Sequence, residues 1–241
     1  MWGGGADKTR KEKYSTMSNM NQVCIWIAEF VPLFATLFSL IYGLFHFFRK
    51  GKPLFLQSIT LAMASYALSL TYHTCVAVTN ATIMEGFTPA YLGRMGFYMF
   101  FITASYGQLD RIVDDGSTQM RKARLIALTA PVVACILFIP NIFATSNVST
   151  KISYALIWIP AIFAVYFNLK HAIIPDLDFG FIKAIKPFNI FALCLGFSEL
   201  LCLTAWDYFS SIFLAIMSVV FGILCVCTMV SAKKGVEKWT I

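Results

Sequence analysis

The stretch Pro89–Gly116 reads PAYLGRMGFYMFFITASYGQLDRIVDDG, an apolar and aromatic run that ends in acidic residues and a glycine. Arg94 stands about one turn inside this run, and Asp110 and Arg111 stand where it closes. The run is long enough to cross a bilayer, because ~20 residues at about 1.5 Å per residue span the hydrocarbon core. A charge that deep in lipid is costly unless a partner neutralises it, so Arg94 predicts a buried polar cluster.

Apolar runs of similar length recur along the chain of 241 residues. The seven runs are Val23–Phe48, Leu54–Thr79, Tyr91–Ile112, Ala123–Ala144, Ile152–Leu169, Phe188–Trp206 and Tyr208–Val230. Hydrophobic residues make up 59% of the chain and charged residues 13%, which is too little charge to cover a soluble domain. The short connections leave no room for a soluble catalytic domain. We therefore expect an all-α integral membrane protein, a bundle of seven transmembrane helices, and no enzyme.

Polar segments are expected at both ends of this bundle. Residues 1–22 are predicted to form a disordered tail, residues 23–232 the seven-helix membrane domain and residues 233–241 a cytoplasmic tail. The last boundary follows because few apolar residues come after Lys233 and Lys234 to continue the helix. The first run is long, lacks a small-residue cleavage site and follows a polar segment, so it predicts a retained helix and not a signal peptide.

Lysine and arginine are unevenly divided between the two sides of the predicted bundle. One side holds thirteen of them: Arg49, Lys50, Lys52, Arg111, Arg121, Lys122, Arg124, Lys170, Lys183, Lys186, Lys233, Lys234 and Lys238. The other side holds six: Lys8, Arg10, Lys11, Lys13, Arg94 and Lys151. Basic residues favour the cytoplasmic side, so the N-terminus is predicted outside and the C-terminus inside, in the plasma membrane.

The net charge of +7 therefore reflects basic residues that orient the chain in the membrane, and it does not indicate an anionic macromolecular partner. We expect the lipid bilayer as the partner, a second copy or another membrane protein as a further partner, and no nucleic acid.

Four ionisable side chains are predicted to gather in the outer half of the bundle. They are Glu29, His73, Arg94 and Glu199. We expect Glu199 or Glu29 to neutralise Arg94, with His73 hydrogen-bonded nearby, since charges in hydrocarbon need partners. Two interpretations stay open. The cluster either fixes the packing of the helices or lines a water-accessible pocket that faces outside.

The inner half is predicted to be poorer in charge. It offers hydroxyl groups and Gln108, until Asp110 and Arg111 form an interfacial charge pair at the cytoplasmic edge. The charged residues of the loop from Lys170 to Lys186 are expected to be solvated. The chain has three histidines and no His-x-x-x-His pair, so no metal site is predicted, because zinc hydrolysis needs several such ligands together.

Local patterns within the predicted helices 1–3 and 6–7, over which the resemblance extends, resemble those of microbial (type 1) rhodopsins, and of proteorhodopsins in particular. They are Tyr72-His73, Pro89 followed by Arg94, Arg94-x-x-Phe97-Tyr98, Leu195-Gly-Phe197-Ser-Glu199 and Val219-Val-Phe221-Gly222. In that family a helix-2 histidine faces the proton acceptor, and helix 3 carries Arg-Tyr-x-Asp-Trp. The resemblance implies a rhodopsin-like fold. Its retinal-pocket equivalent is expected to be lined by Phe97, Tyr98, Phe101, Phe197 and Ser218.

The departures from the family decide the function that we expect. Matching Phe221-Gly222 puts Ser218 where the family has its Schiff-base lysine, and Phe97 where it has the helix-3 proton acceptor. A Schiff base requires a lysine amine, so we expect no covalent cofactor, while retinal or another apolar ligand could still bind non-covalently. The leading hypothesis is an opsin-related protein that acts as a sensor, a scaffold or a binder of an apolar ligand. The alternative is an ion transporter or channel that uses an outer vestibule around Arg94.

Overall fold

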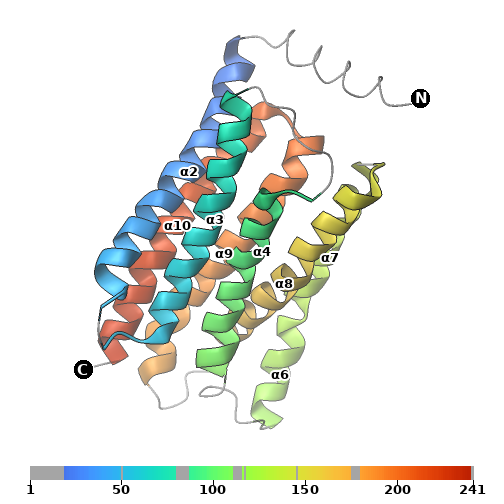
Figure 1. Ribbon diagram of the computed structural model, residues 1–241. Helices are drawn as coiled ribbons and strands as arrows, with labels where there is room; N and C mark the ends of the chain where they lie inside the picture. Colours follow the sequence, from blue (N-terminus) through green and yellow to red (C-terminus); the bar gives the residue numbers. More distant parts are fainter. Residues whose placement is uncertain are drawn as a thin grey trace.

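The computed structural model describes residues 19–49, 51–79, 87–110, 116, 118–144, 146–174 and 180–239. All regular elements in these residues are helices (Figure 1). They are α2 (Asn19–Phe47), α3 (Leu54–Val78), α4 (Pro89–Ile102), the π-helix η1 (Thr103–Asp110), α6 (Thr118–Ala127), α7 (Thr129–Ala144), α8 (Val148–Ile173), α9 (Gly180–Tyr208) and α10 (Ser211–Trp239). The prediction of an all-α protein is confirmed for the described part of the chain.

These helices form rods that alternate in direction along the chain, with α4 continued by η1 and α6 continued by α7 (Figure 1). Six segments are long and apolar enough to cross a membrane: Asn21–Phe47, Leu54–Val76, Met120–Phe143, Val148–Ile173, Lys183–Thr204 and Ser211–Lys238. The rod of α4 and η1 is a further helix beside these six. By length and composition, the helices fit a multi-pass membrane protein.

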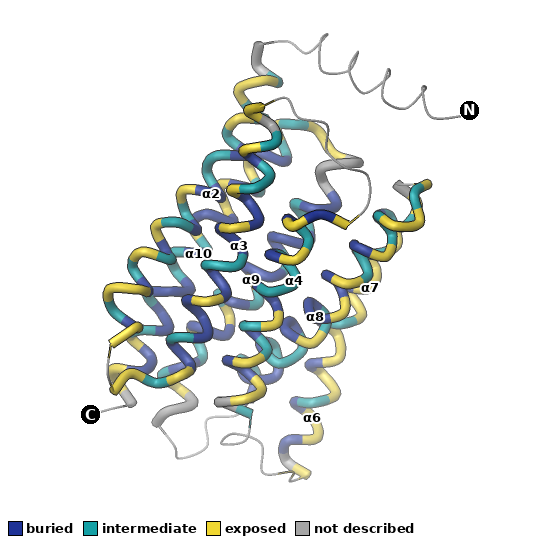
Figure 2. The backbone as a smooth tube through the Cα atoms, viewed as in Figure 1, coloured by how far each residue is buried: buried dark blue, intermediate teal, exposed yellow. Residues whose placement is uncertain are grey.

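Six of the rods close into a ring. α10 packs along α9 and α2, α2 along α3, α3 along α4, α4 along α8, and α8 along α9. The rod of α6 and α7 packs outside this ring, against α8 and α9. In its most apolar window 22% of the residues are buried, against 61% in α3, and most of its surface is exposed (Figure 2). We call the end of the bundle with the start of α2 the upper end, and the end where α10 finishes the lower end (Figure 1).

Two helix boundaries differ from the expected ones. α2 begins at Asn19, so residues 19–22 are helical and not part of a disordered tail; residues 1–18 lie outside the described residues. α10 continues through Lys233 to Trp239, beyond the expected end at residue 232. On this extension Lys233 and Glu237 lie one turn apart, with Nζ 3.9 Å from Oε1.

A break at Leu128 divides the outer rod into α6 and α7, and Pro131 accounts for it. Proline has no N–H to donate to the carbonyl of Ala127 four residues earlier, so the regular ladder fails there. At the same point the Leu128 N–H donates to the Leu125 carbonyl, three residues earlier and not four, at 3.3 Å. The ladder resumes where the Val132 N–H donates to the Leu128 carbonyl, also at 3.3 Å.

Aromatic rings fill the middle of the ring of helices. The Phe97 ring centroid lies 5.0 Å from that of Tyr66 and 4.9 Å from that of Phe101. Tyr66 in turn lies 4.9 Å from Phe221, and Phe101 lies 6.4 Å from Phe188. All five side chains are buried. Burial follows the inner faces of the helices, while exposed apolar residues turn outward, as expected where lipid replaces water (Figure 2).

Small residues let α4 approach α3 closely. The Ser69 hydroxyl donates a hydrogen bond to the Ala90 carbonyl across the two helices at 2.7 Å. A Cβ placed on Gly93 would lie 2.5 Å from the Ser65 carbonyl oxygen and 2.7 Å from Ser69 Cβ, so only glycine fits there. This contact fixes the height of the next residue, Arg94, in the bundle.

Gly93→Ala should therefore lower the free energy of unfolding by about 1–3 kcal/mol, because the added methyl meets a backbone carbonyl that cannot rotate away. Thermal unfolding of the purified protein in detergent would measure this. Gly107→Ala is the matched control on the same rod, because its Cβ would meet nothing within 4 Å. Equal melting temperatures for the two variants would contradict the close approach.

Candidate functional site

Arg94 is placed by the start of α4. Thr88 precedes the helix in an extended conformation, and Pro89 occupies the first turn, where its missing N–H costs nothing. Arg94 follows one turn later, with 18% of its side chain exposed. Its Nε is buried and lies 3.6 Å from Oε1 of Glu199 on α9. The two groups form an ion pair, but the distance is slightly too long for a hydrogen bond.

Glu199 is fully buried and is held by two tyrosine hydroxyls as well as by Arg94. The Tyr98 hydroxyl lies 2.9 Å from Oε2 and the Tyr66 hydroxyl 3.4 Å from Oε1. The Tyr98 hydroxyl is also 2.9 Å from the Gly196 carbonyl, so its single proton can serve either acceptor. A buried carboxylate needs such donors, because burial without them is strongly unfavourable.

Glu29 and His73 form a second pair. His73 Nδ1 lies 3.5 Å from Glu29 Oε1, and the exposed fractions of the two side chains are 29% and 8%. Of the two carboxylates that the sequence offers to Arg94, the structure pairs Glu199 with it and pairs Glu29 with His73. The four predicted residues thus form two pairs, one deeper and one nearer the surface.

A small cavity lies between these pairs and the upper end of the bundle. Its volume is about 50 Å³, and it is lined by Tyr72, His73, Val76, Thr88, Ala90, Tyr91 and Arg94. That volume holds a few water-sized molecules. Two of the four predicted cluster residues, His73 and Arg94, therefore line one cavity. It is the feature that the interpretation as an outward-facing pocket requires.

The residues predicted to line a retinal-pocket equivalent pack against one another. Phe97, Tyr98, Phe101 and Ser218 are buried, and Phe197 is partly buried against the same core. The ring centroids of Phe97 and Tyr98 lie 5.0 Å apart. Side chains thus occupy the middle of the bundle, where the sequence patterns predicted a retinal-pocket equivalent.

The lower end contains an ionic cluster that the sequence reasoning missed. Lys170 Nζ lies 2.6 Å from Asp110 Oδ1, and His171 Nε2 lies 3.0 Å from the same oxygen. The expectation of a solvated Lys170 was wrong, because α8 runs on to Ile173 and leaves the side chains of Lys170 and His171 only 4% and 3% exposed. Arg111, the expected partner of Asp110, lies outside the described residues.

A signal for this cluster was present in the sequence. Asp110 lies near the end of the same apolar run that contains Arg94 near its start. Each charge therefore needed an oppositely charged partner inside the bundle. Asp110 also ends the π-helix η1, which replaces the expected continuous α-helix from Thr103 onward. Just inside the cluster, the Ser105 hydroxyl donates to Asn168 Oδ1 at 2.9 Å, which ties η1 to α8 again. The side chain of Gln108 is outside the described part.

No group of three histidine, cysteine, aspartate or glutamate side chains gathers as a metal site among the described residues. Comparisons with protein-family models, with curated proteins and with solved structures found no match. The resemblance to microbial rhodopsins therefore rests on the local residue patterns alone.

The ion pair between Arg94 and Glu199 should show strong coupling in a double-mutant cycle. Arg94→Met and Glu199→Gln should each lower the free energy of unfolding by about 3 kcal/mol, because each leaves a charge without its partner in an apolar interior. The double variant should lose at least about 1 kcal/mol less than the sum. Glu199→Gln with Lys183→Gln, at the lower end, is the control pair and should be additive. Additive losses for Arg94 and Glu199 would reject the pairing.

Proposed function

We propose that this chain is an opsin-related membrane protein of rhodopsin-like fold that forms no retinal Schiff base and acts as a sensor of a small anion at its upper end. The N-terminus and the upper end face outside in this proposal, in line with the distribution of basic residues. One observation carries the proposal: Arg94 lines a cavity of about 50 Å³ on one side and pairs with the buried Glu199 on the other.

A sensor needs a contact that the ligand and the protein compete for. An anion that enters the cavity would meet the Arg94 guanidinium and the hydroxyl-bearing side chains of Tyr72, Thr88 and Tyr91. It would draw the guanidinium away from Glu199, which belongs to α9. Because α9 and α4 are not neighbours in the ring, weakening this contact frees one wall of the bundle to move against another.

The aromatic core favours a sensor over a binder of an apolar ligand. Phe97, Phe101 and Phe221 are almost completely buried and pack through other rings in the region where an apolar ligand would lie. A ligand of retinal size would have to displace several of these side chains and so break their close packing. The upper cavity requires no such displacement for a small anion.

Binding of a small anion should raise the melting temperature of the protein in nanodiscs. Chloride, nitrate and formate would be titrated at constant ionic strength against gluconate, which is too large for a cavity of about 50 Å³. The stabilisation should disappear in Arg94→Gln and persist in Lys151→Gln, a control that removes a cation on α8. Equal responses of the two variants would mean that the anions act through bulk salt.

A distance measurement in nanodiscs distinguishes a sensor from a scaffold. Spin labels at Tyr106→Cys and Ile190→Cys, both exposed, report the distance between η1 and α9 in a background without native cysteines. A sensor should show a change in this distance on saturation with the anion. Binding with an unchanged distance would leave only the scaffold role.

No covalent pigment should form when the protein is expressed with all-trans retinal. Borohydride reduction followed by mass spectrometry should find no retinyl adduct in the membrane helices, because the described residue at the matching position is Ser218 and not a lysine. Ser218→Lys with Phe97→Asp should restore some pigment if the proposed register is right. An adduct on the unaltered chain would refute the Schiff-base-free proposal.

A second candidate function is ion translocation, favoured by the buried cluster of Asp110, Lys170 and His171 at the opposite end. Ionic groups near both ends are what a path across the bundle requires. The aromatic rings between them would have to open during transport. Gradient-driven or light-driven flux in liposomes, lost in Arg94→Ala, would support this candidate over the sensor.

A further inference from the structure

A second cavity lies at the lower end of the bundle, opposite the end that holds Arg94. It has a volume of about 330 Å³ and lies where α2 ends, α3 begins and α10 finishes. Its lining residues are His46, Phe47, Gly51, Lys52, Pro53, Leu56, Lys233, Val236 and Glu237. This volume falls within the range of small-molecule sites in proteins.

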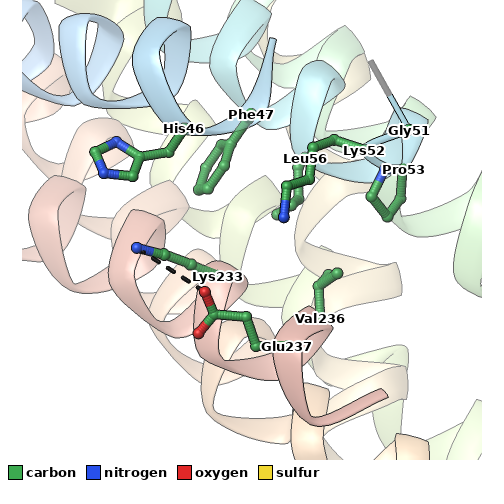
Figure 3. A pocket seen from close by; sticks show the side chains of 9 residues that line it. All are labelled: His46, Phe47, Gly51, Lys52, Pro53, Leu56, Lys233, Val236 and Glu237. Atoms are coloured by element: carbon green, nitrogen blue, oxygen red, sulfur yellow. Dashed lines mark ion pairs between the residues drawn. The ribbon is translucent and has the colours of Figure 1, made fainter. Parts of the chain in front are cut away.

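The rim of this cavity is basic. His46 and Phe47 of α2 face Lys233 and Glu237 of α10, and Lys52 stands on the turn toward α3 (Figure 3). The turn depends on Gly51, whose φ of 86° suits glycine, and the Lys52 N–H donates to the Arg49 carbonyl at 3.1 Å. The two lysines outnumber the single carboxylate, so the cavity favours an anion.

The geometry around Lys233 explains how the rim is held. Lys233 Nζ lies 3.9 Å from Glu237 Oε1 and 5.6 Å from the centre of the Tyr42 ring. His46 Nδ1 lies 2.9 Å from the Tyr42 carbonyl oxygen. Because a carbonyl only accepts hydrogen bonds, Nδ1 carries the proton in this contact. Glu237 thus competes with any bound anion for Lys233.

The floor of the cavity is apolar and its neighbourhood faces lipid. Phe47, Leu56 and Val236 are buried beneath the rim. On the same end of α2, Phe45 and Phe48 are exposed, at 65% and 44%, on the outside of the bundle. An amphiphile could therefore place its charged group between the lysines and its chains along these exposed side chains. Basic pockets between helices at a membrane surface bind phosphate-bearing headgroups in this way.

We propose that this cavity binds the phosphate monoester headgroup of an anionic lipid, with Lys52 and Lys233 as its cationic contacts. Two lysines, with three N–H donors each, suit a phosphate monoester, because its three terminal oxygens outnumber the two of a phosphodiester lipid. The site is separate from the Arg94 cavity, so it does not depend on the sensor proposal.

Binding would be measured in detergent with fluorescent short-chain phosphatidic acid, and phosphatidylcholine would serve as the reference lipid. Lys52→Gln and Lys233→Gln should each weaken phosphatidic acid binding about fivefold, the loss expected for one basic residue near a lipid phosphate. Lys183→Gln, an exposed lysine outside the cavity at the same end, should leave the affinity unchanged. An equal loss in this control would overturn the site in favour of diffuse attraction.

Glu237→Gln gives a test that misfolding cannot imitate. Removing the carboxylate frees Lys233 and should strengthen binding several-fold, whereas a damaged protein would bind more weakly. Weaker or unchanged binding in this variant would overturn the assignment of Lys233.

Competition distinguishes a lipid from a soluble phosphate. Inorganic phosphate and glycerol 3-phosphate should displace the probe only at much higher concentrations than unlabelled phosphatidic acid. Displacement at equal concentrations would assign the phosphate site to a soluble ester and overturn the role of the acyl chains. Failure of all three to displace the probe would overturn the phosphate site itself.

Discussion

The burial of a charge in an apolar bundle is the constraint on which the rest of this structure depends. Lipid offers no water to solvate the guanidinium of Arg94, so the chain must supply a counter-charge. Glu199 supplies it from α9, and Tyr98 joins the same carboxylate from α4. α8 stands between α4 and α9 in the ring, so these side chains connect the two helices across its interior. An electrostatic requirement thereby becomes a packing requirement.

Polar groups and aromatic rings divide the bundle into layers. The ion pair of Arg94 and Glu199 lies below the small upper cavity, the rings around Phe97 fill the middle, and the cluster on Asp110 closes the lower end. The middle layer separates the two ionic ones, and close packing there resists displacement. Solutes can therefore reach the upper and lower ends of the bundle more easily than they can cross its aromatic middle.

Much of the fold followed from residue patterns, because a membrane imposes long apolar runs that are visible in a sequence. The need of Arg94 for a carboxylate was equally visible, but the choice between Glu29 and Glu199 was not. It depends on the rotation of α2 and α9, which the near-uniform apolarity of both helices conceals. Lys170 was misjudged for a related reason. The end of α8 could not be located from hydropathy, since a helix can carry buried charges beyond its apolar part when Asp110 is there to receive them.

Under the proposed relationship to microbial rhodopsins, the position of the counter-charge has moved between helices. Phe97 stands where the family has a carboxylate on the helix of the arginine, and Glu199 now provides the charge from the helix across the ring. A carboxylate at the position of Phe97 would lie among the rings of Tyr66 and Phe101, with no Schiff-base lysine at position 218 to pair with. An aromatic residue suits that place better, because it packs against these rings and needs no polar partner. Under the proposed relationship, absence of the lysine and relocation of the acid are two consequences of one electrostatic balance.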